Sequence, residues 1–237
     1  KKNFLAAAKA AYNEEKKNDS SSSGTGSSGS SGSGSVTSPA VTPEMRGDKP
    51  TAMFSDVTSE HWGFDAVNTL ASEKIISGYG DGTFLPSNNI TRAEFTKLIV
   101  GIEEKLKTSN ENDDKQSENS DVSFSDVNEN DWFAPFVASA AKSGFINGSD
   151  GKFRPNDNIT REDAALIIYR MLTAIGKKPS GYKSFADRND ISDYAKDAVL
   201  ALGGAKIVQG SGENMFLPKN NITRAEAAQL LYNVLNK

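Results

Sequence analysis

Apolar residues with helical spacing recur in three pairs of short runs along the chain. In the first pair, the second run places apolar residues at i, i+3, i+4, i+7 and i+11, which is one face of a helix. These residues are Phe95, Leu98, Ile99, Ile102 and Leu106. Equivalent runs occupy residues 164–175 and 227–234. The pattern predicts an all-α fold built from three helix–loop–helix repeats.

The same short phrase opens the second helix of every pair. It reads Ile-Thr-Arg-Ala-Glu at residues 90–94 and 222–226, and Ile-Thr-Arg-Glu-Asp at residues 159–163. A Phe-x-Pro triplet and three polar residues precede each copy. Repetition at this length indicates one structural unit used three times.

Each phrase predicts a helix start with a capping box. The Thr hydroxyl accepts a first-turn N–H, and the acid three positions later reaches back to the Thr backbone. The pairs are Thr91 with Glu94, Thr160 with Asp163, and Thr223 with Glu226. Because aspartate is shorter than glutamate, we expect the middle box to be looser.

The arginine of each phrase falls in the first helical turn, where a cation opposes the helix dipole. The three residues are Arg92, Arg161 and Arg224. The residues alone leave two explanations open. Each Arg can join the helix start in holding an anion, or it can form a salt bridge with a neighbouring repeat.

Polar segments divide the chain. The Ser/Gly-rich stretch and the prolines after it indicate a flexible linker, and the run of acids between the first two repeats indicates a solvated one. The chain opens without Met or a signal peptide, so we expect the C-terminal part of a longer protein. The expected boundaries are 1–17 for a short helix or remnant of an upstream module, 18–50 for the flexible linker, 51–106 for repeat 1, 107–121 for the acidic linker, 122–176 for repeat 2 and 177–237 for repeat 3.

Composition excludes several classes of site. The chain has no cysteine, which rules out disulfides, thiol chemistry and Cys-based zinc sites, and its single histidine, His61, leaves little room for a catalytic triad. A net charge of -4 without a basic patch argues against nucleic acid. No apolar stretch approaches the roughly 20 residues that span a bilayer. We therefore expect no cofactor, no metal, no nucleic acid and no membrane span.

One unit of about 50 residues buries too little apolar surface to be stable alone. Three units can share a core, and the second helices carry the strongest apolar faces. We therefore expect a pseudo-threefold bundle with these helices inside. Such a bundle has grooves between neighbouring repeats, each edged by one of the capping-phrase arginines.

Together these motifs resemble the S-layer homology domain. In the first repeat, residues 54–57 read Phe-Ser-Asp-Val, Trp62 follows, and residues 78–86 read Gly-Tyr-Gly-Asp-Gly-Thr-Phe-Leu-Pro before the capping phrase at 90–94. The second repeat matches this pattern strongly and the third matches it well. Three tandem copies, here over roughly residues 52–236, are the usual arrangement of that family.

The resemblance implies a non-catalytic anchoring module on the extracellular cell surface of a Gram-positive bacterium. Its expected ligand is secondary cell-wall polysaccharide attached to peptidoglycan, held non-covalently through an acidic sugar such as pyruvylated N-acetylmannosamine. Its expected partners are that polymer and the upstream domains of the same protein, which it would tether to the wall or S-layer. In the family, ligand lies in the grooves between copies, and the capping-phrase Arg is a main contact.

Carried over to this chain, the resemblance makes Arg92, Arg161 and Arg224 the anion contacts. Arg can engage a ketal-linked carboxylate bidentately beside helix N–H groups. Trp62 and Trp132 can stack on a sugar face, and packing of the first helix is their alternative role.

Loop residues are the remaining ligand candidates, since a glycine lets backbone approach a sugar and a carboxylate accepts hydroxyl hydrogen bonds. These are Gly78, Gly80, Asp81, Gly148 and Asp150. A helix C-cap turn is the alternative for the first glycine of each loop, at residues 78, 148 and 210. Structural roles are expected for the aspartates that follow each Phe-x motif, which can cap the next turn or orient a neighbouring group. They are Asp56, Asp126 and Asp187.

The third repeat lacks the Trp, and Ile191 or Tyr194 stands near that place. We therefore expect unequal grooves, with the weakest one relying on the aromatic residue and loop of repeat 3.

Two other functions remain open. One is a self-assembling or protein-binding helical repeat. The less favoured one is a wall-polysaccharide hydrolase that uses paired carboxylates drawn from Asp56, Asp81, Asp126 or Asp150.

Overall fold

The structure is a computed structural model that describes residues 52–107 and 123–237. The expected helix at 1–17, the linker at 18–50 and all but the first residue of the acidic linker lie outside the described residues. Within the described ranges the chain forms α-helices, one 3₁₀ turn and isolated β-bridges, with no sheet. The all-α prediction is therefore confirmed. The helices are α2 (Phe64–Ser72), α3 (Arg92–Lys107), α4 (Ala134–Lys142), α5 (Arg161–Ala174), α6 (Asp193–Gly204) and α7 (Arg224–Leu235), and the 3₁₀ turn is η1 (Gly212–Asn214).

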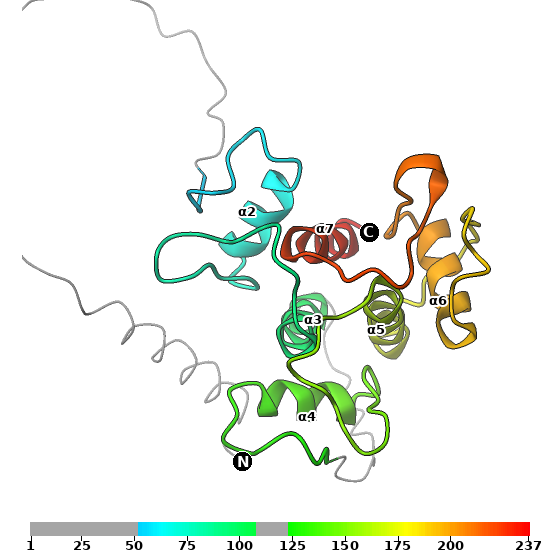
Figure 1. Cartoon of the computed structure of the whole chain (residues 1–237), viewed down its shortest axis with the longest axis horizontal. Helices are drawn as coiled ribbons and strands as arrows, with labels where there is room; N and C mark the ends of the chain where they lie inside the picture. The colour runs from blue at the N-terminus through cyan, green and yellow to red at the C-terminus, as the bar shows by residue number, and fades with distance from the viewer. Residues whose placement is uncertain (1–51, 108–122) are drawn as a thin grey trace, which may run out of the picture.

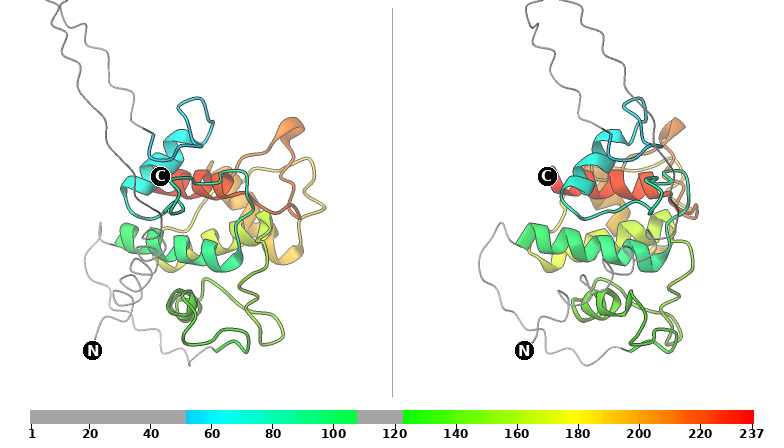
Figure 2. Two further views of the ribbon diagram at one scale, coloured as in Figure 1. Left: turned by 60° about the vertical axis from the view of Figure 1, so that its left-hand side comes forward. Right: turned by 90° about the vertical axis from the view of Figure 1, so that its left-hand side faces the viewer.

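The second helices of the repeats, α3, α5 and α7, lie together in the middle of the molecule. Figure 1 shows them nearly end-on, with α2, α4 and α6 around them. In the side views of Figure 2, α3 and α7 run lengthwise in the same direction. In the parts of the chain that the structure describes, no helix has the length and apolarity needed to cross a membrane.

The first helix of each repeat packs most extensively on the second helix of another repeat. Helix α2 lies against α7, α4 lies against α3, and α6 lies against α5. Each pair therefore joins one repeat to the repeat before it, with repeat 1 joined to repeat 3. The chain closes this cycle, so that every repeat covers part of its neighbour's core.

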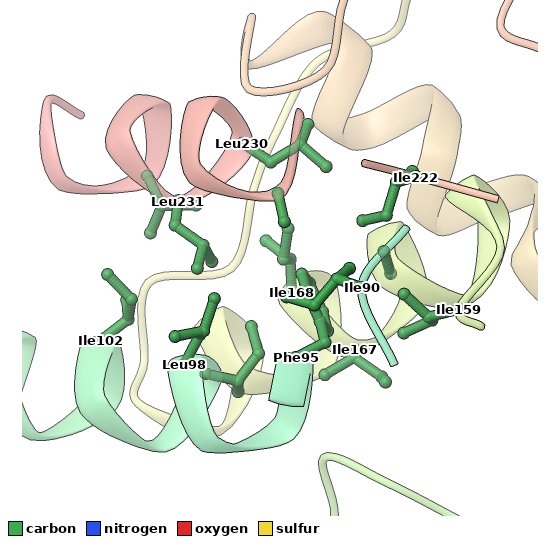
Figure 3. Packing of buried hydrophobic residues seen from close by; sticks show 14 of the residues in the cluster. Ile90, Phe95, Leu98, Ile102, Ile159, Ile167, Ile168, Ile222, Leu230 and Leu231 are labelled. Carbon is green, nitrogen blue, oxygen red and sulfur yellow. The ribbon is translucent and has the colours of Figure 1, made fainter. Parts of the chain in front are cut away.

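A closed ring of backbone hydrogen bonds joins the three repeats at the start of the central helices. The Ile90 N–H donates to the Ile222 carbonyl, the Ile222 N–H to the Ile159 carbonyl, and the Ile159 N–H to the Ile90 carbonyl, each over 3.1 Å. All three isoleucines are buried, and Figure 3 shows their side chains meeting at one end of the core. The ring places the three capping phrases at one end of the molecule.

The predicted apolar faces form the shared core. The five residues that define the stripe of α3 are all buried, and Leu98 and Ile102 point toward Leu231 of α7 in Figure 3. Burying one such side chain is worth about 1.5–3 kcal/mol. Because these partners come from different repeats, one repeat alone would leave most of this surface in water.

A carboxylate clamp holds each Phe-x-Pro triplet. In repeat 1, Asp56 accepts the backbone N–H groups of Phe84 and Leu85, both at 2.8 Å. Leu85 has a φ of 55°, which is a strained conformation for a residue with a side chain. Asp126 and Asp187 form the equivalent pairs of hydrogen bonds in repeats 2 and 3. The three aspartates therefore hold a distant loop, which is the orienting role that the sequence left open beside a cap on the following turn.

The helix C-cap alternative for the loop glycines is wrong. Helix α2 ends at Ser72, and the left-handed residue after its cap is Lys74. Gly78 lies farther along the loop, where a Cβ would overlap the Phe54 ring and the Thr83 carbonyl. Gly148 meets the equivalent obstacles in repeat 2. These glycines are therefore required by close packing within the loop.

Candidate functional site

The capping boxes form as the sequence predicts at two helix starts. The Thr91 and Thr223 hydroxyls accept the N–H groups of Glu94 and Glu226 at 3.2 Å, and each glutamate accepts the Thr backbone N–H. At α5, Thr160 accepts the Asp163 N–H, but the Asp163 carboxylate accepts the Tyr194 hydroxyl at 2.9 Å. The shorter acid is thus drawn away from the helix start.

The first N–H groups of the central helices are used by the next repeat. Arg92 and Ala93 donate their N–H groups to the carbonyls of Asp157 and Pro155, at 2.9 and 3.0 Å. Helices α5 and α7 repeat this arrangement. The expectation of helix N–H groups ready for an anion is therefore wrong. An anion at these positions has to be held by side chains.

Each capping-phrase arginine also reaches across to the next repeat. The Nε atoms of Arg92, Arg161 and Arg224 donate to the carbonyls of the Phe residues in the facing Phe-x-Pro triplets, over 2.8–2.9 Å. Their Nη1 atoms face the third-position acid of the neighbouring helix start, at 3.6, 3.0 and 3.4 Å respectively. The salt bridge to a neighbouring repeat, one of the two sequence-based explanations, is therefore present. The ligand role of these arginines stays a prediction.

Three grooves contain these arginines, and each gathers residues from all three repeats. One repeat supplies the Arg, the next supplies the loop, and the remaining repeat supplies an aromatic side chain. We call them groove A (Arg224), groove B (Arg92) and groove C (Arg161). The pairing of repeats, which the sequence left open, follows from this cyclic order.

Groove A is the smallest, at about 230 Å³. The Arg224 guanidinium is largely buried, with its Cζ 4.6 Å from the ring centre of Phe84 and 5.0 Å from that of Tyr79. Lys97 of α3 and Trp132 of repeat 2 also line this groove. This groove therefore combines two cations with three aromatic rings.

Groove B, at about 520 Å³, is the most cationic. Its lining adds Lys152, Arg154 and Arg170 to Arg92, against the carboxylates of two aspartates. Tyr194 of repeat 3 closes one side and lies within hydrogen-bond distance of Glu162 and Asp163. Burial, followed by these carboxylates, raises the pKa of Tyr194, so that the phenol stays protonated.

Groove C, at about 730 Å³, carries five amide side chains in its lining. Its Arg161 is held by Glu226 at 3.0 Å and by the Gln209 carbonyl at 3.4 Å. Trp62 of repeat 1 lies on its edge with 61% of its surface exposed. The amide side chains of its lining are Gln209, Asn220, Asn221, Gln229 and Asn233.

The aromatic candidates occupy equivalent places. Trp62 and Tyr194 each lie 29 positions before their capping Thr, and Trp132 lies 28 positions before its own. Trp62 is mostly exposed, which argues against packing as its role, whereas Trp132 is partly buried against the core. Tyr194 therefore stands where the other repeats have Trp, while Ile191 is buried in the core.

The aromatic residue and the loop of repeat 3 do not belong to the same groove, contrary to the expectation from the sequence. The aromatic residue of repeat 3, Tyr194, belongs to groove B, whereas the loop of repeat 3 lines groove C. From the sequence we expected one groove to depend on both features. Because each groove draws on three repeats, the two departures affect different grooves.

The loop acids lie at exposed tips outside the groove linings. Asp81 accepts the backbone N–H and the hydroxyl of Thr83, and the hydroxyl contact is the larger cause of its lowered pKa. Asp150 pairs with Arg154 at 3.8 Å and is 86% exposed. Gly80 is exposed at the same tip as Asp81. Of the five loop candidates, Gly148 lines a groove directly, in groove B.

Sequence reasoning missed Glu162, which is buried in repeat 2 where repeats 1 and 3 have alanine. Its carboxylate accepts hydrogen bonds from Lys219 at 2.5 Å, the Ser192 hydroxyl and the Ser192 N–H. Burial alone would raise the pKa of Glu162, but these hydrogen bonds outweigh it and lower the pKa. The sequence did contain a signal for Glu162, because the other two repeats have alanine at the equivalent position.

The groove residues Lys97, Arg170 and Gln229 were also missed. They lie on the outer faces of central helices, where a polar residue in the sequence cannot be told from an ordinary solvent-facing one. Only the loop of the next repeat makes these positions part of a groove. In the described part of the chain, no group of three His, Cys, Asp or Glu residues is placed to hold a metal ion.

Comparison with known proteins identifies relatives of very different size and name. The chain is 38% identical to an exoglucanase of Acetivibrio thermocellus over 80% of its length, which covers 17% of that protein. It is 31% identical to an S-layer protein of Bacillus anthracis over 75% of its length, covering 20% of that protein. A cellulosome-anchoring protein of Acetivibrio thermocellus is 30% identical over 68% of the chain and 35% of that protein.

The chain thus spans between a sixth and about a third of these relatives. The S-layer homology domain matches residues 54–96, 123–165 and 184–228, which contain the carboxylate clamps, the loops and the capping phrases. The chain therefore belongs to the S-layer homology domain family and carries three tandem copies of that domain.

Proposed function

We propose that this chain is a non-catalytic module that anchors an attached protein to the bacterial cell wall by binding secondary wall polysaccharide. One observation carries the proposal. Each of the three grooves combines an arginine from one repeat with an aromatic side chain from another. A guanidinium suits a carboxylate, and a flat ring suits a sugar face, so the pair fits an acidic sugar.

The relatives support attachment as the shared task. An exoglucanase, an S-layer protein and a cellulosome-anchoring protein have names that indicate different tasks, yet each contains a segment related to this chain. A segment common to such different proteins is best explained by what they have in common. We infer a cell-surface location, with upstream domains of the same protein as the tethered partner.

The ligand we propose is an acidic amino sugar of the wall polymer, such as pyruvylated N-acetylmannosamine. The ketal carboxylate would meet the Arg of a groove, and the sugar ring would lie on Trp62, Trp132 or Tyr194. The glycines and acids at the loop tips would touch only sugars that extend out of the groove. The Nε atom of each arginine already donates to a backbone carbonyl, so the ketal carboxylate would meet the Nη atoms.

We also propose that the three repeats are related by an approximate threefold axis. The isoleucine ring, the cyclic pairing of helices and the equivalent arginine contacts support this arrangement. The repeat and linker boundaries stay predictions. They are 1–17, 18–50, 51–106, 107–121, 122–176 and 177–237.

A hydrolase is disfavoured by what the carboxylates contact. Asp56 and Asp126 each accept two backbone N–H groups, and Asp81 is engaged by Thr83. These carboxylates stabilise loop conformations. We therefore assign them no role in glycoside hydrolysis.

The proposal is tested by co-sedimentation with purified wall sacculi, before and after chemical removal of the secondary polymer. We expect binding that disappears when the polymer is removed. Trp62→Ala should weaken binding while the melting temperature stays within about 2 °C, because the indole is mostly exposed. The matched control is Tyr182→Ala, since Tyr182 is 65% exposed and lies outside the three groove linings. Binding that survives removal of the polymer would contradict the proposal.

A further inference from the structure

Arg92 differs from the other two capping-phrase arginines in how much of its guanidinium is used. Arg161 and Arg224 each donate three hydrogen bonds, to the facing Phe carbonyl, to a second backbone carbonyl and to a glutamate. Within the described residues, Arg92 donates one, from Nε to the Phe153 carbonyl. A guanidinium has five N–H donors. Arg92 therefore keeps more donors for a ligand than either of the others.

The aspartate at the third position of the middle capping phrase explains this difference. In grooves A and C a glutamate lies 3.4 and 3.0 Å from the Nη1 atom, whereas the Asp163 carboxylate lies 3.6 Å from Arg92, beyond ordinary hydrogen-bond length. Aspartate is one methylene shorter, and Asp163 also accepts the Tyr194 hydroxyl at 2.9 Å. The carbonyl of Asn147, just before the loop glycine, takes no hydrogen bond from Arg92 in the described part of the chain, unlike its counterparts in the other grooves.

A second guanidinium, that of Arg170, lines the same groove. Arg170 lies ten positions after the capping Thr, where repeats 1 and 3 have Gly101 and Asn233. Its side chain is partly buried, and its guanidinium donates no hydrogen bond to any described residue. Burial lowers the pKa of Arg170 and the charge of Asp163 opposes this, so the two side chains lie near each other.

One carboxylate, that of Asp163, thus faces two guanidiniums. The loop side of groove B is balanced, with two cations against two aspartates: Lys152, Arg154, Asp157 and Asp150. Glu162, which also accepts the Tyr194 hydroxyl, pairs with Lys219. The helix side of groove B therefore lacks one negative charge, and its unused donors come from two repeats.

We propose that groove B is the principal site for the acidic sugar, with Arg170 as a second contact for its carboxylate beside Arg92. The inference rests on the proposed function and adds a specificity residue that lies outside the capping phrase. A carboxylate between two guanidiniums accepts charge-assisted hydrogen bonds from both. The sugar ring would lie on Tyr194, whose hydroxyl is held by Asp163.

Calorimetric titration of the full chain with the methyl glycoside of pyruvylated N-acetylmannosamine tests this inference. We expect Arg170→Gln to weaken the tightest site about tenfold, with a melting temperature within about 2 °C of the parent chain. The same glycoside lacking the ketal should bind the variant and the parent chain within about twofold of each other. The matched control is Arg188→Gln, which removes the same charge from an exposed position outside the three groove linings.

The affinity of Arg188→Gln for the acidic glycoside should stay within about twofold of the parent chain. An unchanged affinity in Arg170→Gln overturns the inference, and so does an equal loss for the glycoside that lacks the ketal. A parent chain that binds neither the acidic glycoside nor sacculi shows instead that the proposed function has failed.

A second variant tests the same site without removing a cation, and it decides the question if Arg170→Gln proves unstable. Asp163→Glu gives repeat 2 the acid of the other repeats, which can reach both the Thr160 N–H and Arg92. We expect the tightest site to weaken about fivefold while the melting temperature does not fall, because the capping box is completed. An unchanged or higher affinity in Asp163→Glu would contradict the role of the unused Arg92 donors.

Discussion

Each capping-phrase arginine lies where the helix dipole disfavours a cation, and contacts with the next repeat offset that cost. Arg224 is the clearest case, because its guanidinium contacts the Phe84 carbonyl, the Ser77 carbonyl and the Glu94 carboxylate. Hydrogen bonds that involve a charged group contribute about 1.5–3 kcal/mol each in favourable cases. The same side chain therefore links two repeats and lines a groove, so its loss would affect both stability and binding.

Glu162 should make the unfolding free energy of the protein depend on pH in the acidic range. Its pKa is lowered in the folded state, so its contribution is complete above the ordinary value of 4.5 and is lost as the pH falls through the folded pKa. We expect Glu162→Gln to cost about 2 kcal/mol of unfolding free energy at pH 7. At about pH 3, below the ordinary value, the difference from the native protein should be smaller than at pH 7.

Urea unfolding at the two pH values measures this effect. Asp193→Asn is a suitable control, because Asp193 is exposed on the surface and pairs only with the nearby Lys196 among the described contacts. Its substitution should change the unfolding free energy little at either pH. A deficit for Glu162→Gln of equal size at both pH values would contradict the charge-based explanation.

The same capping phrase begins the central helix of every repeat. At α7 the box between Thr223 and Glu226 is complete, and Glu226 also pairs with Arg161 of the neighbouring repeat. One short phrase therefore stabilises its own helix and supplies an ion partner to another. At α5 the acid is Asp163, and its carboxylate is shared with Tyr194.

Removal of a cap hydroxyl should have a moderate cost. We expect Thr223→Ala to lower the unfolding free energy by about 1 kcal/mol, because the Glu226 N–H loses its acceptor. Thr223→Ser keeps the hydroxyl and should restore most of the stability. Equal unfolding free energies for the Ala and Ser variants, measured in urea, would show that the hydroxyl contributes nothing.

The whole molecule is closed by contacts that run in one direction around the three repeats. Helix α2 depends on α7, and the isoleucine ring needs a member from every repeat. Stability is therefore shared by all three repeats and is not a sum of independent units. This arrangement also explains why each groove draws on residues from the whole chain.

Truncation tests this dependence. A fragment of residues 52–176 lacks α6 and α7, so α2 and α5 each lose the helix that covers them. We expect the fragment to show reduced helix content and no cooperative unfolding transition by circular dichroism in urea. Residues 52–237 serve as the control and should unfold cooperatively. A cooperative transition in the two-repeat fragment would contradict the closed arrangement.

Many features of the fold could be predicted because they depend on residues that are close together in the sequence. The box at Thr91 and Glu94 depends on two residues three positions apart, and the apolar stripe of α3 depends on helical periodicity alone. The sequence by itself therefore determined the helix starts, the buried faces, the number of repeats and the presence of an Arg at each start.

The tertiary structure decided which repeat each group meets. Nothing near Asp56 in the sequence indicates that it holds the N–H groups of Phe84 and Leu85, and nothing near Arg92 indicates that its first-turn N–H is already bound by repeat 2. Lys97 and Gln229 read as ordinary surface residues until another repeat encloses them. These features arise from contacts between segments far apart in the chain, whose direction around the cycle no local pattern encodes.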